Sequence, residues 1–283
     1  MTENAPNAVT GFAGLHHADE PLLLPNAWDH ASAAALAAQG FRAVGTTSLA
    51  VAAAAGLPDG AAATREQTLL LARTLGPGPY WLSVDAEDGF SDDPEEVASF
   101  ARELYRAGAA GINLEDGLAP VGRHAAKIAA VRAAVPGLFV NARTDTYWTA
   151  RPGTDGRTRR EDTFRRLDAY QQAGAQGVFV PGLTEPHEIA ALVHRLDVPL
   201  NVLYSPTGPS ALQLAGLGVR RISLGSLLYR RALGAAVETA TDVREGRTPT
   251  GAVPAYAEVQ ALSRHSVRGG AGTTVVFGRP RCD

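Results

Sequence analysis

The sequence predicts a single α/β domain folded as a parallel (β/α)8 barrel of the TIM type. Eight short apolar runs recur along the chain, and each is followed by a stretch with helical character. Glycines stand just past four of the expected helices, where a left-handed C-cap is needed: Gly40, Gly108, Gly174 and Gly218. A chain of 283 residues suits one barrel. We prefer the closed barrel to an open doubly wound sheet because short connections join the eight units.

The expected strands are short and apolar, and most end in polar residues. They cover 22–24, 41–45, 80–84, 111–114, 138–142, 177–180, 200–203 and 221–224. The helices are expected at 29–39, at 62–75 after a loop, from 94 onward, at 119–134, at 161–173, from 186 onward, at 210–217 and at 226–244. The third helix has the clearest start, because Asp93 can cap it and Pro94 suits its first position. The polar segment 148–160 is expected to be an exposed loop.

The barrel is expected to occupy about 20–246 of a single domain that covers 1–283. After Gly246 the chain is interrupted by Pro249 and Pro254, and 255–265 can form one more helix. The glycine-rich tail from Val267 is expected to be loose.

Composition excludes several kinds of protein. The formal net charge is −3, so no basic excess indicates nucleic acid or an anionic membrane as a partner. Cys282 is the only cysteine, which rules out a disulfide within one chain and a cysteine-ligated metal site. No apolar run is long enough to cross a bilayer, and no secretory signal precedes the first strand. We therefore expect a cytoplasmic protein.

Crowded carboxylates after two neighbouring strands give the first indication of function. Asp85, Glu87 and Asp88 follow the third strand, and Glu115 and Asp116 follow the fourth. These side chains are expected to lie close together, because the carboxyl ends of barrel strands meet at one face. Carboxylates this crowded repel one another unless a cation shares them or they splay into water. The pattern predicts a site of the Mg²⁺ type.

Other polar residues at strand ends extend the predicted site. Arg143 follows the fifth strand, and its guanidinium can hold a carboxylate or phosphoryl group through two hydrogen bonds. Trp28 and Asn201 follow or end the first and seventh strands and are candidate substrate contacts. These residues predict that the substrate is a small anion.

Several of these residues also have a purely structural interpretation. Asp88 and Asp93 can serve only as caps, Asp116 can face solvent, and Asp145 can be the partner that orients Arg143. The histidines are expected at the surface, with His16 and His17 in the N-terminal segment and His124 and His187 at helix starts.

Seven short motifs together resemble one known family, although none is specific alone. They are Pro25-Asn26-Ala27-Trp28-Asp29, Gly56-Leu57-Pro58-Asp59-Gly60, Val84-Asp85-Ala86-Glu87-Asp88-Gly89, the stretch 108–116, Asn141-Ala142-Arg143-Thr144-Asp145, Val180-Pro181-Gly182 and Arg221-Ile222-Ser223-Leu224-Gly225. The chain resembles the isocitrate lyase/phosphoenolpyruvate mutase superfamily over about 24–246. The resemblance implies a Mg²⁺-dependent barrel enzyme that handles enolates of 2-oxo acids, with Mn²⁺ as an alternative metal.

The resemblance also implies roles for individual residues. Asp85 matches the direct metal ligand, and Arg143 matches the arginine that binds substrate. The carboxylates that match holders of metal-bound water are Asp59, Glu87 and Glu115. The residues that fall where backbone amides cradle the substrate carboxylate are Thr46, Thr47 and Ser48. The family exchanges its last barrel helix between protomers, which implies a homodimer or homotetramer.

The chain departs from the family pattern after the fourth strand. Isocitrate and methylisocitrate lyases carry a Lys-Lys-Cys-Gly-His loop there, whereas this chain has Gly117-Leu118-Ala119-Pro120-Val121-Gly122-Arg123-His124. The segment has no cysteine and no lysine, so the acid/base is unassigned and the mobile lid looks truncated. His124, Tyr204 and water on the metal are the candidates for acid/base catalysis.

Three functions follow as hypotheses. The first is a Mg²⁺-dependent carbon–carbon lyase or decarboxylase, which acts on a small 2-oxo or 2-hydroxy (di)carboxylate through an enolate. The second is cleavage or formation of a phosphorus–carbon bond, as in a phosphonopyruvate hydrolase or a phosphoenolpyruvate mutase. The third is a degenerate barrel that binds a metabolite without turnover.

Overall fold

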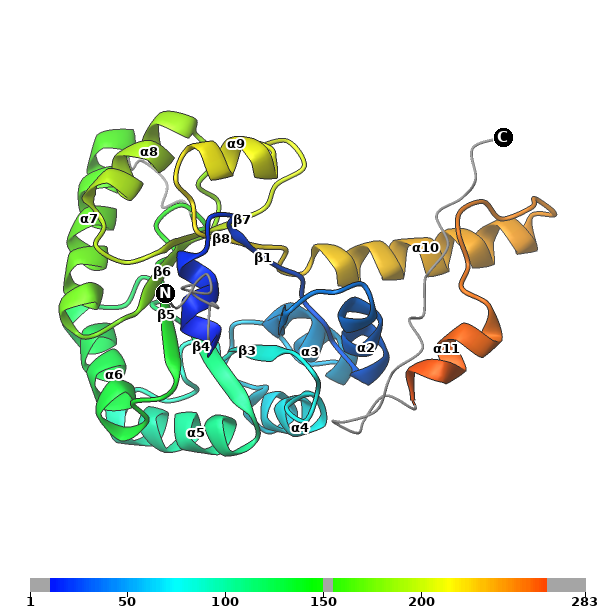
Figure 1. Ribbon diagram of the computed structural model, residues 1–283, viewed down its shortest axis with the longest axis horizontal. Helices are drawn as coiled ribbons and strands as arrows, with labels where there is room; N and C mark the ends of the chain where they lie inside the picture. Colours follow the sequence, from blue (N-terminus) through cyan, green and yellow to red (C-terminus); the bar gives the residue numbers. More distant parts are fainter. Residues whose placement is uncertain (1–10, 150–154, 264–283) are drawn as a thin grey trace, which may run out of the picture.

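The predicted barrel is confirmed by a computed structural model that describes residues 11–149 and 155–263 (Figure 1). All strand pairs are parallel, in the order β1-β8-β7-β6-β5-β4-β3-β2. The strands are β1 (Leu22–Leu24), β2 (Ala43–Gly45), β3 (Trp81–Asp85), β4 (Ala109–Glu115), β5 (Phe139–Arg143), β6 (Gly177–Val180), β7 (Leu200–Leu203) and β8 (Arg221–Ser223).

The barrel closes between β1 and β2 through a short stretch of backbone just beyond β1. Asn26 forms a parallel bridge with Gly45. Gly45 N donates to Pro25 O at 2.8 Å, and Ala27 N donates to Gly45 O at 2.8 Å. These bonds join the two edge strands, so the carboxyl ends of all eight strands surround one mouth.

The helices pack outside the strands, as the alternating pattern predicts. They are α1 (Gly11–Gly14), the 3-10 turn η1 (Leu15–His17), α2 (His30–Ala38), α3 (Ser48–Ala55), α4 (Arg65–Leu75), α5 (Pro94–Arg106), α6 (Val121–Ala134), α7 (Gly156–Gln172), α8 (Pro186–Arg195), α9 (Ala211–Gly216), α10 (Leu227–Arg244) and α11 (Tyr256–Leu262). The core lies between this helical layer and the strands.

Two helices differ from the expectation. The segment after β2 was expected to be a loop, but its alanine-rich run forms α3, which ends at the left-handed Gly56. Helix α7 begins earlier than expected because Asp155 caps it and accepts from Thr158 N at 2.9 Å. The N-cap role of Asp93 is confirmed, since it accepts from Glu95 N at 2.9 Å.

The N-terminal segment closes the end of the barrel opposite the mouth. Phe12 and His16 pack against Phe139 at the start of β5, and His16 stacks on that ring at 4.3 Å. Gly111 leaves room for this plug, because a Cβ there would lie 2.6 Å from the Phe12 ring. The expectation that His16 lies at the surface is wrong: its side chain is buried, and burial lowers its pKa to about 3.

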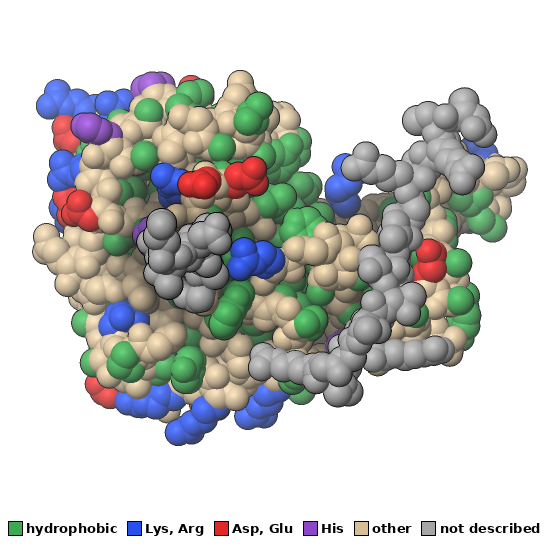
Figure 2. Space-filling view, viewed as in Figure 1, with side chains coloured by type: hydrophobic (Ala, Val, Ile, Leu, Met, Phe, Trp, Pro, Cys, Tyr) green, Lys and Arg blue, Asp and Glu red, His purple; other side chains and the backbone are tan. Residues whose placement is uncertain are grey.

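The C-terminal helices leave the barrel. Helix α10 projects away from it and has no buried residue, and α11 returns beside α2 (Figure 1). Charged side chains are scattered in small groups over the visible face (Figure 2). None of the described helices is long and apolar enough to cross a membrane. The predicted loose tail from Val267, the end of the last expected helix, and 150–154 of the expected loop lie outside the described residues.

Candidate active site

A cavity of about 400 Å³ lies at the mouth of the barrel, where the sequence predicts the site. Seven of the twelve predicted site residues line it. They are Thr46, Thr47, Ser48, Asp59, Asp85, Glu115 and Arg143. The remaining lining residues are Asn26, Leu49, Gly60, Asn113, Gly117, Asp145, Trp148, Thr149, Phe179, Pro181, Leu203, Ser223, Gly225 and Ser226.

Asp85 is held from two sides at the end of β3. Its backbone N donates to Thr46 Oγ1 at 2.9 Å, which ties it to the end of β2. Its Oδ2 accepts from Ser48 N, the first residue of α3, at 3.0 Å. A carboxylate at a helix N-terminus is stabilised by the unpaired amides and by the helix dipole. Asp85 is thus an ordered carboxylate whose Oδ1 is available to a ligand.

The predicted amide cradle is only partly available. Thr46 N donates to Ser83 O at 2.9 Å as part of the sheet, and Ser48 N is used by Asp85. The amides of Thr47 and Leu49 have no acceptor among residues 11–149 and 155–263. Of the three amides predicted to form the cradle, only that of Thr47 is therefore open, and Leu49 N is a further open donor beside it.

Glu87 lies behind the cavity wall rather than in it. Its carboxylate accepts from Thr64 Oγ1 at 2.5 Å and from Ala62 N at 3.2 Å. Its backbone is left-handed, with φ 46°, which is unfavourable for a residue with a side chain and requires support from its surroundings. Burial raises the pKa of Glu87, those two hydrogen bonds oppose the rise, and Asp85 adds to it. The side chain of Glu87 therefore affects Asp85 through its charge, without a hydrogen bond between the two carboxylates.

Arg143 is oriented by two carboxylates and one ring. Its Nε donates to Asp145 Oδ1 at 2.7 Å, and its Nη1 lies 2.6 Å from Glu115 Oε2. The guanidinium lies over the Phe179 ring, 5.9 Å from its centroid. The prediction that Asp145 is the partner of Arg143 is confirmed. Nη2 makes no hydrogen bond to any described residue, so it can reach an anion in the cavity.

The charge balance of the cavity suits a cation. Four carboxylates line it, from Asp59, Asp85, Glu115 and Asp145, against the one guanidinium of Arg143. Burial raises the pKa of Glu115 well above its usual range, Arg143 opposes the rise, and Asp85 adds to it. A bound cation would relieve this repulsion. Among the described residues, no three His, Cys, Asp or Glu side chains could together hold a metal ion.

Five predicted site residues do not line the cavity. The Trp28 ring packs against Tyr229 at 5.6 Å, and Tyr204 packs against the core. Asn201 is buried one layer below, where its Nδ2 donates to Ser223 Oγ at 3.1 Å. The other two are Glu87 and His124.

His124 is buried between α6 and α7, so the expectation that it is exposed is wrong. Its ring meets Tyr170 edge-on at 4.6 Å, and its Nε2 has no hydrogen-bond partner in the described part of the chain. Burial lowers the pKa of His124 to about 4, and the nearby Asp116 opposes the change. A neutral, enclosed imidazole here cannot reach a ligand in the cavity without movement of the wall.

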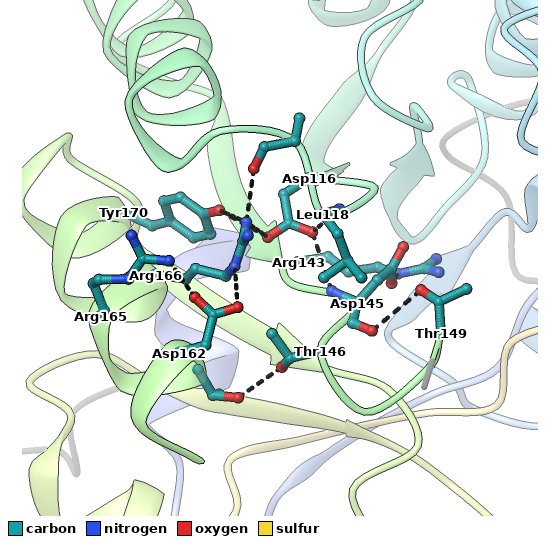
Figure 3. Close-up of polar contacts among 12 residues, drawn as sticks. Asp116, Leu118, Arg143, Asp145, Thr146, Thr149, Asp162, Arg165, Arg166 and Tyr170 are labelled. Atoms are coloured by element: carbon teal, nitrogen blue, oxygen red, sulfur yellow. Dashed lines mark hydrogen bonds and ion pairs between the residues drawn. The ribbon is translucent and has the colours of Figure 1, made fainter. Parts of the chain in front are cut away.

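Asp116 is also buried, which contradicts its expected place in solvent. Its side chain accepts hydrogen bonds from Arg166 and Tyr170 of α7 (Figure 3). Burial pushes the pKa of Asp116 up, but the hydrogen bonds from Leu118 and Tyr170 and the charge of Arg166 hold it below its usual value. The sequence held a weak signal for this contact, because Arg166 and Tyr170 stand four apart on one face of a helix.

The sequence also did not predict the position of Arg221. It is fully buried inside the barrel, directly below the cavity floor. Its Nη2 donates to Asn113 Oδ1 at 3.0 Å and its Nε to Ser223 Oγ at 3.3 Å, and both of these partners line the cavity. The signal was the strand alternation, which turns Arg221 and Ser223 to the same side of β8.

The only lysine of the chain supports the site from outside. Lys127 is buried on α6, and its Nζ donates to Asp88 O at 2.8 Å and lies 3.4 Å from Asp88 Oδ2. It secures the loop that follows Asp85. Lys127 does not line the cavity and is not available as a mobile catalytic group.

The fold and the cavity together define a (β/α)8 barrel with an acidic cavity, which contains one arginine, at the carboxyl ends of its strands. The sequence profile of the phosphoenolpyruvate phosphomutase family matches residues 12–244, and the chain belongs to this family. Its members include carbon–carbon lyases and mutases, so the predicted superfamily and enzyme class are confirmed.

Individual relatives agree with that assignment. An uncharacterized protein of Mycobacterium tuberculosis (strain H37Rv) is 43% identical over 254 residues, which cover 88% of this chain and 95% of the relative. The 2-methylisocitrate lyase of Bacillus subtilis (strain 168) is 31% identical over 67% of this chain and 64% of its own length. A solved structure from Burkholderia cenocepacia J2315, provisionally named a lyase/mutase, has 34% identity and a TM-score of 0.78, and the match covers 90% of this chain and 94% of that one.

Proposed function

We propose that the protein is a Mg²⁺-dependent carbon–carbon lyase or decarboxylase that acts on a small 2-oxo or 2-hydroxy (di)carboxylate through an enolate. The observation that carries the proposal is the cavity itself, in which four carboxylates stand against one guanidinium at the mouth of the barrel. A divalent cation offsets most of the negative charge of such a site, and the cation and the guanidinium can then hold a small anionic substrate.

The acidic residues would hold the cation. Asp85 is the proposed direct ligand, and Asp59 and Glu115 are proposed to hold the water around it, with Glu87 supporting them from behind. When bound, Mg²⁺ (or Mn²⁺) would supply the positive charge that stabilises an enolate oxygen as the carbon–carbon bond breaks. The chain's own contribution is to keep these carboxylates ordered before the ligand arrives.

Arg143 and the start of α3 would bind the substrate carboxylate. The free Nη2 of Arg143 and the unpaired amides of Thr47 and Leu49 are donors that border the same cavity. Donors that need no reorganisation bind and stabilise an anion most strongly. The Phe179 ring lies under the guanidinium, 5.9 Å from ring centroid to guanidinium carbon, and adds a cation–π contact.

Apart from the four carboxylates already assigned to the cation, its water and Arg143, the described lining of the cavity offers no protein base. This described lining contains no histidine, lysine, cysteine or tyrosine. In decarboxylation of a 2-oxo acid that carries a second carboxylate on C3, the bond from C3 to that carboxylate breaks, CO2 departs, and the enolate of the remaining 2-oxo acid takes one proton from water. Cleavage of a 2-hydroxy acid needs a base for the hydroxyl proton. We therefore rank 2-oxo acids first among the substrates.

A substrate panel tests the proposal. Pyruvate, glyoxylate and CO2 release are measured from 2-oxo and 2-hydroxy acids, with Mg²⁺ or with EDTA, against heat-denatured protein as the blank. We expect turnover that EDTA abolishes and that Asp85→Asn lowers by about 100-fold or more. Asp93→Asn, at an exposed cap of α5, is the matched control and should retain activity. No turnover across the panel, or turnover untouched by EDTA, contradicts the proposal.

The family match favours a second candidate, phosphorus–carbon chemistry. A guanidinium and helix-start amides can hold a phosphoryl group as well as a carboxylate. Phosphorus NMR of phosphonopyruvate and phosphoenolpyruvate, each incubated with the protein and Mg²⁺, decides between carbon–carbon and phosphorus–carbon chemistry. Oxalate binding that depends on Mg²⁺, without reaction in either assay, would instead indicate a barrel that binds a metabolite without turnover.

We also infer a homodimer or homotetramer in which α10 packs on a second copy. This helix has no buried residue, and Leu233, Val237 and Val243 are 49%, 67% and 65% exposed. An apolar face of that extent is normally covered. Light scattering should give a mass of two or four chains, and Val237→Glu should lower it; a wild-type monomer contradicts the inference. The predicted cytoplasmic location stays a prediction.

A further inference from the structure

The strongest polar cluster outside the cavity centres on Asp116, the residue after Glu115. Its carboxylate accepts four hydrogen bonds and is completely buried (Figure 3). Oδ1 accepts from Leu118 N at 2.9 Å and from Asp145 N at 3.1 Å. Oδ2 accepts from Arg166 Nη1 at 2.9 Å and from Tyr170 Oη at 2.8 Å. One side of this carboxylate faces the site loops, and the other faces α7.

Arg166 grips both Asp116 and the loop that follows it. Its Nη1 also donates to Ala119 O at 2.9 Å, and its Nε donates to Asp162 Oδ2 at 3.1 Å one turn earlier on α7. The Arg166 side chain is only 5% exposed. Two carboxylates and one carbonyl hold the guanidinium in a single orientation. The planar group is therefore a rigid point of attachment for the loop.

The loop that is gripped has an unfavourable backbone. Gly117 and Leu118 are both left-handed, with φ 48° and 60°. Such a conformation at leucine persists only where surrounding contacts enforce it. The enforcing contacts are the bonds from Leu118 N to Asp116 Oδ1, from Ala119 N to Asp116 O at 2.7 Å, and from Arg166 to Ala119 O. Gly117 lines the cavity, so these contacts shape its wall.

The same carboxylate also reaches the arginine of the site. Asp145 N donates to Asp116 Oδ1, and Asp145 Oδ1 accepts from Arg143 Nε. In addition, Asp116 N donates to Arg143 O at 3.1 Å. Asp116 therefore secures both the backbone of Arg143 and the carboxylate that orients its guanidinium.

We propose that Arg166 and Tyr170 are positioning residues that act through Asp116: they lock the loop 117–120 as a fixed wall of the cavity and hold Arg143 in its binding orientation. The inference rests on the proposed function only for what Arg143 binds. The loop after β4 is then a rigid part of the site, and α7 is the element that makes it rigid.

Amide hydrogen exchange tests the lock without any need for activity. The variants are Tyr170→Phe, which keeps the ring against His124, and Arg166→Gln, with Arg166→Lys as the conservative rescue. Exchange at the amides of Leu118 and Asp145 should quicken by about fivefold for the loss of one hydroxyl and by about tenfold or more for Arg166→Gln. Tyr80→Phe is the matched control, because it removes a half-buried hydroxyl bonded to Leu75 O at the other end of β3. It should leave both amides unchanged.

Oxalate binding in the presence of Mg²⁺, measured by calorimetry, tests the effect on the site. We expect affinity to fall by about fivefold in Tyr170→Phe and by more in Arg166→Gln, with partial recovery in Arg166→Lys, while Tyr80→Phe binds as the wild type does. Unchanged exchange at both amides in folded Tyr170→Phe and Arg166→Gln overturns the lock. Faster exchange with wild-type oxalate affinity overturns the positioning role. If the wild type binds no oxalate, the proposed function fails, and the exchange result still decides the lock.

Discussion

Two arginines are buried in this barrel, and their surroundings differ. Arg166 lies between α6 and α7 and forms ion pairs with Asp116 and Asp162, at 2.9 and 3.1 Å. Arg221 lies inside the barrel and donates only to neutral partners, Ser83, Asn113 and Ser223. No carboxylate of the described residues is within ion-pair distance of it, and its Nη1 has no partner among them.

The difference separates two uses of a buried charge. The charge of Arg166 is balanced by the carboxylates of Asp116 and Asp162, so its bonds fix the conformation of the loop. Arg221 forms no ion pair with a described residue. Burial lowers its pKa to about 9 and the charge of Asp85 opposes the fall, so Arg221 stays protonated at neutral pH. A cation without a directly bonded carboxylate in a low-dielectric interior acts on charges at longer range, and here the nearest such region is the cavity floor. We infer that Arg221 favours anions in the cavity.

The largest expected effect comes from breaking the paired arginine. Asp116→Ala leaves Arg166 buried without its main partner, so the free energy of unfolding should fall by about 3–5 kcal/mol. Urea denaturation measures this loss. Asp162→Ala removes the other, more exposed partner and should cost clearly less. Equal losses in the two variants would mean that the ion pair of Arg166 with Asp116 contributes no more to stability than its pair with Asp162.

Acid should destabilise both regions through their histidines. Burial lowers the pKa of His16, beside Arg221, to about 3 and that of His124, beside Arg166, to about 4, against an ordinary value near 6.5. Both are neutral in the folded protein, so their contribution is complete above about pH 6.5 and is lost as the pH falls toward 4 and 3. Between pH 7 and 5 each should cost about 1–2 kcal/mol.

The phenylalanine variants separate the two histidines. His16→Phe and His124→Phe keep a ring in place and remove the titrating group, so each should flatten the fall in the urea midpoint between pH 7 and 5. The double variant should flatten it most. If neither variant changes the pH dependence of the urea midpoint, the acid sensitivity must come from carboxylates instead of these histidines.

Removing Arg221 should lower oxalate affinity without lowering stability, whereas breaking the ion pair of Arg166 should lower stability. Arg221→Met keeps the volume and removes a buried charge, so stability should stay constant or rise. Oxalate affinity in the presence of Mg²⁺ should fall by about tenfold, because the anion loses a nearby positive charge. Calorimetry and urea denaturation on the same preparation give both numbers. A loss of stability with unchanged affinity would show that Arg221 has a structural role only.

The smallest effect is expected at a surface ion pair of α7. Arg157 and Glu161 stand one turn apart with exposed side chains, 2.8 Å from each other. Solvent and salt screen such pairs, so Arg157→Ala should leave the urea midpoint and oxalate affinity unchanged. A measurable shift would mean that stability and affinity respond to substitutions anywhere on α7. The effects of the Arg166 variants could then not be attributed to its buried ion pairs.

The sequence alone determined the barrel and the place of its site. Apolar runs with helical stretches between them are local patterns, and the carboxyl ends of parallel strands must meet at one face. Asp85, Glu115 and Arg143 could be placed there for that reason alone, and all three line the cavity. The alanine-rich helix α3 was also a local pattern, and it was missed because its motif was interpreted as a loop.

Only the tertiary structure decided which polar residues face the cavity and which lie behind it. Asp116 directly follows Glu115 but turns to α7, where its partners are 50 and 54 residues away along the chain. Arg221 meets Asn113 across 108 residues. His124 lies at a helix start, yet the packing of α6 on α7 encloses it. Burial and charge pairing arise from contacts between distant segments. Local patterns, such as the spacing of Arg166 and Tyr170, show which side chains share a face but not which partner they meet.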